Sequence, residues 1–185
     1  MINRQLDIQR LGANFDPTRT RQAVDDIRKY IELTPRFDTF GYSTTIVGAA
    51  TALADTDLFS TTIPGGSLAD AGDAIHFEAS VTYAANANTK RVRLKFGATT
   101  LYDTGLLAIN SGSLSIVGTL VRITATSTRF VLGTNSTSAL LAGLSLTGSA
   151  SDDVDDDQVF SLVGNNGTAS DVSGWMWRLT YLPRP

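Results

Sequence analysis

The sequence predicts a mainly β fold: an antiparallel two-sheet sandwich, of jelly-roll or related Greek-key form, preceded by an N-terminal arm and one α-helix. Roughly eight short runs with alternating apolar and polar side chains recur about every ten residues after residue 40, with turn sequences between them. Helical periodicity is absent from this region, which excludes a parallel α/β sheet. We therefore divide the chain into an arm and helix, residues 1–40, and a β-sandwich, residues 41–185.

The composition fits one β-rich domain with an appendage. The chain has 185 residues, of which 42% are hydrophobic and 18% charged, with a net charge of −3 that does not suggest a nucleic-acid-binding surface. The absence of cysteine excludes disulfides and thiolate chemistry. The first residues lack the apolar region of an export signal, and no apolar run approaches the roughly 20 residues that span a bilayer. We expect a soluble protein made inside a cell.

The N-terminal region is expected to contain one helix. Asp16-Pro17 is a strong helix start, Thr34-Pro35 ends it, and the residues between are compatible with a helix of about four turns. Its apolar stripe consists of Val24, Ile27 and Ile31. Such a stripe packs either against the protein's own sheets or against copies of the chain or a neighbouring subunit.

Residues 1–15 show no regular period. They carry Ile8, Leu11 and Phe15 and are too apolar for a solvated tail. An arm that lies on a partner, or on the rest of the protein, suits this composition better.

The clearest β signal runs from Gly72 to Phe96. Residues 73–83 alternate strictly, as do residues 91–96, and a turn-like Asn-Ala-Asn-Thr separates the two runs. This pattern predicts a β-hairpin with one buried and one solvated face.

The other strands follow from the same alternation. A strand region with a break at Gly41 is expected at 37–47, a loop around Asp55 and Asp57, and a strand end at 61–63. Later strands are expected at 113–117, 120–125, 129–132, 140–146, 158–163 and 175–182, with a break at Gly118. In the last strand, the side chains expected on one buried face near the centre of the core are Trp175, Trp177, Leu179 and Tyr181.

Chemistry-bearing motifs are few. His76 lies on the polar side of a strand without a nucleophile motif, and the acidic run Asp152–Asp157 lacks the spacing of a calcium loop. We interpret this acidic run mainly as a solvated loop, and calcium binding is the alternative. Lys90, Arg91, Arg93 and Lys95 are predicted to form the outward face of one strand, either solvated or in contact with an acidic neighbour. No cofactor is expected.

One stretch carries a resemblance. Residues 96–105 read Phe-Gly-Ala-Thr-Thr-Leu-Tyr-Asp-Thr-Gly, followed by Asn-Ser-Gly-Ser-Leu at 110–114 and Val121-Arg122. Together with Gly72-Asp73, this resembles β-sandwich modules of tailed-bacteriophage virion proteins. The likeness covers roughly residues 60–182, and Leu114 stands where an aromatic residue is usual.

The resemblance implies a trimeric jelly roll without enzymatic activity, of the kind found in capsid decoration (cement) proteins, head fibres and tail-fibre tips. We expect a homotrimer on the capsid surface of a virion, assembled in the host cytoplasm and bound to the major capsid protein, with no nucleic acid or membrane partner. The predicted contact residues are Ile8, Leu11, Phe15, Val24, Ile27, Ile31, Arg91 and Arg93.

The alternatives are a fibre protein and an enzyme. In a fibre or receptor-binding protein, loops such as 133–139 and 151–157 would touch a host surface glycan. An enzyme acting on polysaccharide is the least favoured class, because the carboxylate pairs that it needs cannot be located in the sequence.

Overall fold

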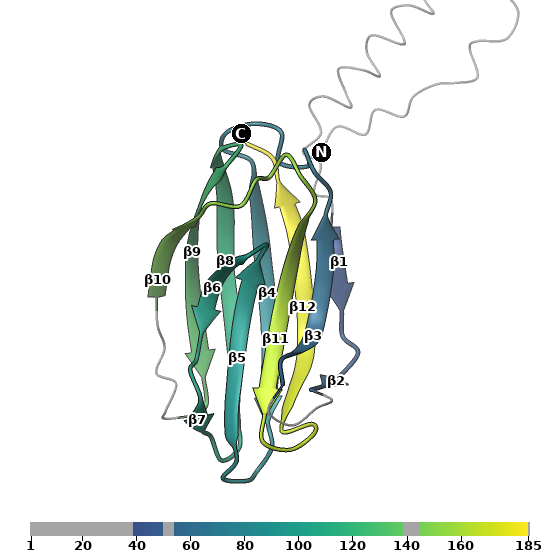
Figure 1. Ribbon diagram of the computed structural model, residues 1–185, viewed down its shortest axis with the longest axis vertical. Coiled ribbons are helices and arrows are strands. Elements are labelled where there is room, and N and C mark those ends of the chain that lie inside the picture. The colour runs from purple at the N-terminus through teal and green to yellow at the C-terminus, as the bar shows by residue number, and fades with distance from the viewer. Residues whose placement is uncertain (1–38, 50–53, 139–144, 185) are drawn as a thin grey trace, which may run out of the picture. The chain divides into compact units, whose positions relative to one another are not determined.

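The protein forms two antiparallel β-sheets packed as a sandwich, which confirms the predicted sandwich (Figure 1). The computed structural model describes residues 39–49, 54–138 and 145–184, so the predicted arm and helix lie outside the described residues. All elements in this part of the chain are strands. Within it, no helix is long and apolar enough to cross a membrane.

Sheet A has seven strands in the order β1-β12-β4-β8-β9-β10, with β2 also paired to β12. Its strands are β1 (Thr39–Ser43), β2 (Val47–Gly48), β4 (Ala74–Tyr83), β8 (Gly112–Thr124), β9 (Ser127–Ser136), β10 (Ser145–Ala150) and β12 (Val172–Leu182). Sheet B has five strands in the order β3-β11-β5-β6, with β7 also paired to β5. Its strands are β3 (Thr56–Ile63), β5 (Thr89–Phe96), β6 (Thr99–Asp103), β7 (Leu107–Ala108) and β11 (Gln158–Asn166).

The inner faces of the sheets meet in a core of aromatic rings. The ring of Phe160 lies 5.2 Å from that of Phe77, 5.7 Å from that of Phe96 and 5.6 Å from that of Trp177. Phe59 stacks on Trp177 with ring centroids 6.1 Å apart. These rings come from both sheets, and burying each contributes roughly 1.5–3 kcal/mol. The prediction that Trp177 lies near the core centre is confirmed.

The predicted hairpin of residues 73–96 is wrong in its pairing, although both strands exist. β4 pairs with β12 and β8 in sheet A, whereas β5 pairs with β11, β6 and β7 in sheet B. Both strands turn an apolar face inward, as predicted. An apolar face serves equally for strands that pair side by side and for strands that face each other across about 10 Å of core. The alternation therefore identifies the strands and not their partners.

The predicted break at Gly118 is also wrong, because β8 runs without interruption through this residue. A Cβ atom at Gly118 would lie 2.4 Å from Cζ of Phe77 and 2.5 Å from the carbonyl oxygen of Val131. The glycine marks close packing of neighbouring residues, not a turn. Similarly, Asp57 lies within β3 and not in the predicted loop.

Candidate interaction surface

A β-bulge in β12 decides which aromatic side chains leave the core. Gly174 pairs with Val81 of β4 and Met176 pairs with Ser80, so Trp175 is an extra residue without a partner on β4. Two residues of β12 thus occupy the space of one, which rotates the strand locally.

The bulge places the consecutive side chains of Trp175 and Met176 on the outer face of sheet A. Gly174 faces inward, since a Cβ atom there would lie 2.6 Å from the Phe59 ring, and Trp177 faces inward with 2% exposure. Trp175, between them in sequence, is 56% exposed. The prediction that Trp175 shares the buried face is therefore wrong. The sequence Trp-Met-Trp held a signal for the bulge, because three large apolar residues in succession cannot all obey alternation.

The exposed Trp175 belongs to a group at the β1 side of sheet A. Tyr42 of β1 is 66% exposed and is the register partner of Arg178. Ile46, which is 61% exposed, directly precedes β2, and β2 pairs with β12 at Gly174. We call Tyr42, Ile46, Trp175 and Met176 the edge patch. Exposed aromatic residues grouped in this way are typical of contact surfaces.

A row of register partners crosses sheet A from the edge patch to β9. Tyr42 lies opposite Arg178, Arg178 opposite Glu78, Glu78 opposite Val117, and Val117 opposite Gly133. Partners in register project from the same face of a sheet. The outer face of sheet A therefore presents, in this order, the ring of Tyr42, the cation of Arg178, the carboxylate of Glu78, the apolar side chain of Val117 and the position of Gly133, which has no side chain.

The two charges in this row do not pair with each other. His76 Nε2 lies 3.3 Å from Glu78 Oε1, and His76 Nδ1 lies 3.5 Å from Thr119 Oγ1. Arg178 is exposed and forms no ion pair with any of the described residues. The lone histidine, His76, thus lies on the partly exposed polar side of β4, as predicted. The guanidinium group of Arg178 has no ion-pair partner among the described residues and is available for contact on this face.

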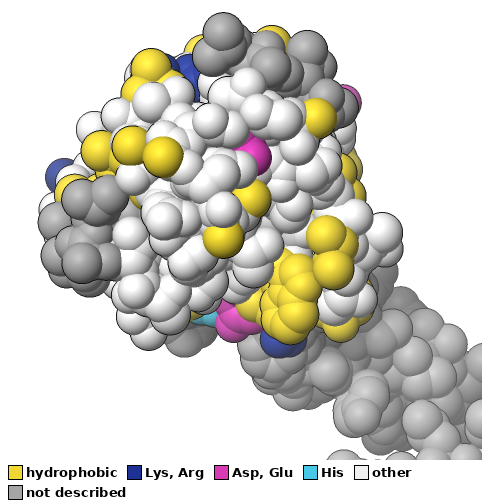
Figure 2. Space-filling model, turned by 90° about the horizontal axis from the view of Figure 1, so that it is seen from below, with side chains coloured by type: hydrophobic (Ala, Val, Ile, Leu, Met, Phe, Trp, Pro, Cys, Tyr) yellow, Lys and Arg dark blue, Asp and Glu magenta, His cyan; other side chains and the backbone are white. Residues whose placement is uncertain are grey.

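The side of the face beyond Glu78 is apolar and hollowed. Val117 is 45% exposed and Val131 is 49% exposed. Gly133 lies opposite Val117 and two residues from Val131 on β9, and a Cβ atom there would meet no atom within 4 Å. We call Val117, Val131 and Gly133 the valine shelf. An end-on view shows hydrophobic side chains beside acidic and basic ones at one border of the molecule (Figure 2).

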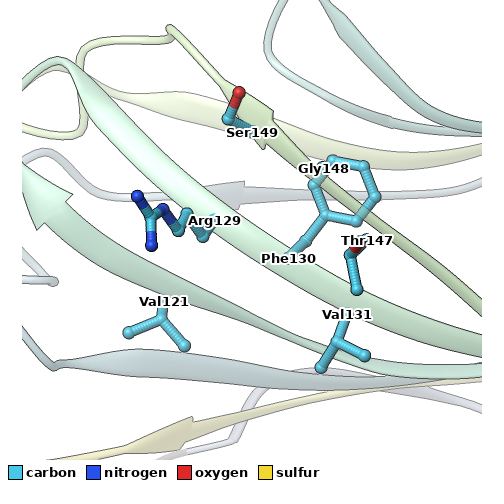
Figure 3. A pocket seen from close by; sticks show the side chains of 7 residues that line it. All are labelled: Val121, Arg129, Phe130, Val131, Thr147, Gly148 and Ser149. Atoms are coloured by element: carbon cyan, nitrogen blue, oxygen red, sulfur yellow. The ribbon is translucent and has the colours of Figure 1, made fainter.

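A shallow groove continues this face toward β10. It has a volume of about 490 Å³. Figure 3 shows its side chains, contributed by β8, β9 and β10; they are Val121, Arg129, Phe130, Val131, Thr147 and Ser149, with Gly148 at the Phe130 ring. The groove is largely apolar and carries one guanidinium group.

The predicted contact residues Arg91 and Arg93 lie on the outer face of sheet B, and both are paired within the chain. Arg91 Nε donates to Asp103 Oδ1 at 2.8 Å, and its Nη2 donates to Oδ2 of the same carboxylate. Arg93 forms an ion pair with Asp55. The hydrogen bonds from Arg91 hold the pKa of Asp103 below its usual value. Contact through these arginines stays a prediction, while the other six predicted contact residues lie outside the described residues.

Lys90 does not lie on the outward face predicted for it. It is fully buried, because it occupies the same side of β5 as Val92, Leu94 and Phe96. The three N–H groups of its ammonium are shared among four acceptor oxygens: the carbonyls of Ile109 at 2.6 Å, Asn86 at 3.0 Å and Asn88 at 3.2 Å, and Asn86 Oδ1 at 2.8 Å. The lysine thereby ties together two of the connections that close one end of the sandwich.

Asp171 completes this buried polar cluster. Its carboxylate accepts hydrogen bonds from Asn86 Nδ2 at 2.6 Å, Asn88 Nδ2 at 2.8 Å and the Thr168 N–H at 3.0 Å. Burial alone would raise the pKa of Asp171, but these hydrogen bonds and nearby Lys90 outweigh it and lower the pKa. The charged groups of Lys90 and Asp171 thus both have hydrogen-bond partners, and we interpret the cluster as one that stabilises this end of the sandwich.

The acidic loop 151–157 closes the opposite end. Asp152 accepts the Ala98 N–H at 2.8 Å, Asp157 accepts the Gly65 N–H at 2.8 Å, and Asp155 accepts from Arg122 Nη1 at 2.9 Å. These carboxylates point to different partners, and within residues 39–49, 54–138 and 145–184 no group of three or more His, Cys, Asp or Glu residues could hold a metal ion. The calcium alternative gains no support.

The chain was also compared with known proteins. No protein-family model matches its sequence, and no curated protein matches it.

Proposed function

We propose that this protein is a structural virion protein: a capsid decoration (cement) protein that binds as a homotrimer to a phage head and stabilises contacts between major capsid subunits. The observation that carries the proposal is the outer face of sheet A, with its edge patch and its valine shelf. Trp, Tyr, Met and Arg are the residues enriched in protein–protein interfaces. Such a face binds a partner protein through many contacts spread over a large surface, and this binding needs neither a cofactor nor catalysis.

We also propose that the sandwich is a jelly roll. The strands pair in a nested order: β1 with β12, β3 with β11, β4 with β8, and β5 with β6. A long antiparallel ribbon rolled into two sheets gives this order, and β9 and β10 extend sheet A beyond it. The nested order supports a jelly roll, an architecture used by viral capsid proteins.

Attachment to the head is assigned to residues 1–38, whose sequence supplies the six apolar contact residues predicted above. These residues join the sandwich directly at β1, which also carries Tyr42. A fully extended chain spans at most about 3.5 Å per residue, so a partner that holds Ile31, the last predicted contact residue of this segment, lies within about 39 Å of the Tyr42 backbone. A head-bound N-terminus would thus bring the sandwich to the capsid surface.

A fibre or receptor-binding protein is the second candidate, and the groove of Figure 3 favours it. Arg129, Thr147 and Ser149 could donate hydrogen bonds to a sugar while Val131 contacts its apolar face. The acidic loop offers less, because three of its carboxylates already bind other parts of the chain.

Binding to purified heads separates these two functions. The full-length protein is added to expanded phage heads that lack it, and bound copies are counted along with the temperature at which the heads break. We expect saturable, stoichiometric binding and an increase in that temperature. Binding to host cells with no binding to heads would contradict the decoration function. Loss of that cell binding in Arg129→Ala would then establish the groove as a glycan site.

A further inference from the structure

We infer that three copies of the chain meet through the outer faces of sheet A, around an axis roughly parallel to the strands, with the edge patch of each copy on the valine shelf of the next. The partner for this surface is therefore a second copy of the same chain. The inference rests on the homotrimer of the proposed function and assigns the surface that forms it.

Charge complementarity selects a second copy as the partner. Arg178 and Glu78 stand side by side on β12 and β4, yet Glu78 contacts His76 and Arg178 has no acidic partner among the described residues. Around an axis parallel to these strands, the β12 side of one copy faces the β4 side of the next. Each Arg178 then meets Glu78 of the neighbouring copy, and a ring of alternating charges closes.

The apolar parts of the row match in the same arrangement. Moving outward from the charge pair along the row, Tyr42 lies on one side and Val117 and Gly133 on the other. Trp175 lies three residues from Arg178 along β12. The open space above Gly133 can receive an aromatic side chain from the neighbouring copy. At the level of this row, contact would remove from water two side chains that are each at least 45% exposed: Tyr42 of one copy and Val117 of the next.

The absence of cysteine from the natural chain allows a direct test. In the full-length double variant Tyr42→Cys/Val117→Cys, the two positions lie three strand spacings apart on one copy, about 14 Å. A disulfide requires Cα atoms within about 7 Å, so the bond cannot form inside one copy. We expect oxidation to give covalent trimers on a non-reducing gel. The control Val159→Cys/Val117→Cys, which places one cysteine on the outer face of sheet B, should give none.

A charge exchange tests the ring independently. Glu78→Arg and Arg178→Glu each bring like charges together and should weaken association at least about tenfold. The double variant Glu78→Arg/Arg178→Glu should restore it, which a general loss of folding would not. Val131→Arg should also dissociate the trimer, whereas Val159→Arg, a residue of similar exposure on sheet B, should not.

The outcomes separate this inference from the proposed function. A wild-type mass of three times 19.7 kDa together with covalent trimers supports both the homotrimer and the surface. The same mass without cross-links, or with covalent dimers alone, overturns the surface and leaves the homotrimer standing. A monomer mass at micromolar concentration overturns both, and the head-binding assay then decides the decoration function separately.

Discussion

The indole N–H of Trp177 on β12 donates a hydrogen bond to the hydroxyl oxygen of Thr61 on β3 at 3.0 Å, and so joins the two sheets. Trp177 is 2% exposed and stacks on Phe59. The bulge that turns Trp177 toward Thr61 also turns Trp175 outward. The core anchor and the exposed edge patch are therefore two results of one local distortion in β12.

The contact between Trp177 and Thr61 predicts the effect of removing the hydroxyl group. Thr61→Val keeps the shape of the side chain but leaves the indole N–H without its partner, so the free energy of unfolding should fall by about 1–3 kcal/mol. Urea denaturation measures this change. Thr62→Val, at an exposed neighbouring position of β3, is the control and should change it by less than about 0.5 kcal/mol. Equal effects of the two variants would show that the hydrogen bond does not stabilise the sandwich.

The edge patch should matter for association and not for folding. Because Trp175 is 56% exposed, Trp175→Ser should leave the urea midpoint nearly unchanged while light scattering shows a weaker oligomer. Leu106→Ser, at a residue 59% exposed beside sheet B, is the matched control and should keep the wild-type mass. A large loss of stability in Trp175→Ser would mean that the bulge depends on this ring.

Two glycines on neighbouring strands should differ in their response to substitution by alanine. Gly118→Ala places a methyl group against Phe77, Val131 and Leu132, and overpacking of this kind costs about 1–3 kcal/mol. Gly133→Ala meets nothing within 4 Å and should leave the monomer fold unaffected. Thermal unfolding of both variants measures the difference. A neutral Gly118→Ala would contradict the close packing of β8 on Phe77.

The buried carboxylate of Asp171 should make the fold sensitive to acid. Its pKa is lowered in the folded protein, so the ionised group adds stability above its unfolded pKa of about 4, and that contribution is lost as the pH falls through the folded pKa. Asp171→Asn should cost about 2 kcal/mol at neutral pH, because the amide cannot accept all of the same hydrogen bonds.

Unfolding curves of wild type and Asp171→Asn across the acid range test this directly. The difference between the two proteins should shrink as the pH falls through the folded pKa. Asp156→Asn, at an exposed position of the acidic loop, serves as the control and should follow the wild type. A difference that does not change with pH would show that charge on Asp171 is not what stabilises this end.

Deleting residues 1–33 separates folding from attachment. We expect the remaining chain to unfold cooperatively, as measured by circular dichroism, and to lose binding to phage heads. An unfolded product would show instead that this segment forms part of the core of the sandwich.

The sequence locates the inward-facing residues of the main strands but not the pairing of those strands. The strand expected at 140–146 lies mostly outside the described residues. Alternation identifies the inward residues of β4 and β5, because burial of an apolar face depends only on local period. Whether two such strands pair or face each other depends on connections and on partners distant in sequence, so the expected hairpin is wrong. Gly118 shows a related ambiguity, since a glycine that ends a strand and one that allows close packing look alike in sequence.

The candidate surface was accessible to sequence reasoning only in part. The basic run on β5 is visible in the sequence, but its pairing with Asp55 and Asp103, on neighbouring segments, depends on the sheet. The row of Tyr42, Arg178, Glu78 and Val117 joins four separate strands, so no local pattern contains it. The alternation of side chains along β5 places Lys90 on the same inward side as Val92. The burial of Lys90 could therefore be predicted from the sequence, and only its charge suggested an outward position.

The most direct test of the proposed function is the position of the chain in an intact virion that carries it. Immunogold labelling with an antibody against the sandwich, combined with averaged electron micrographs, measures this position. We predict label on the head surface, in groups of three copies at regular lattice positions. Label confined to the tail tip, or none on the particle, would contradict a capsid decoration protein.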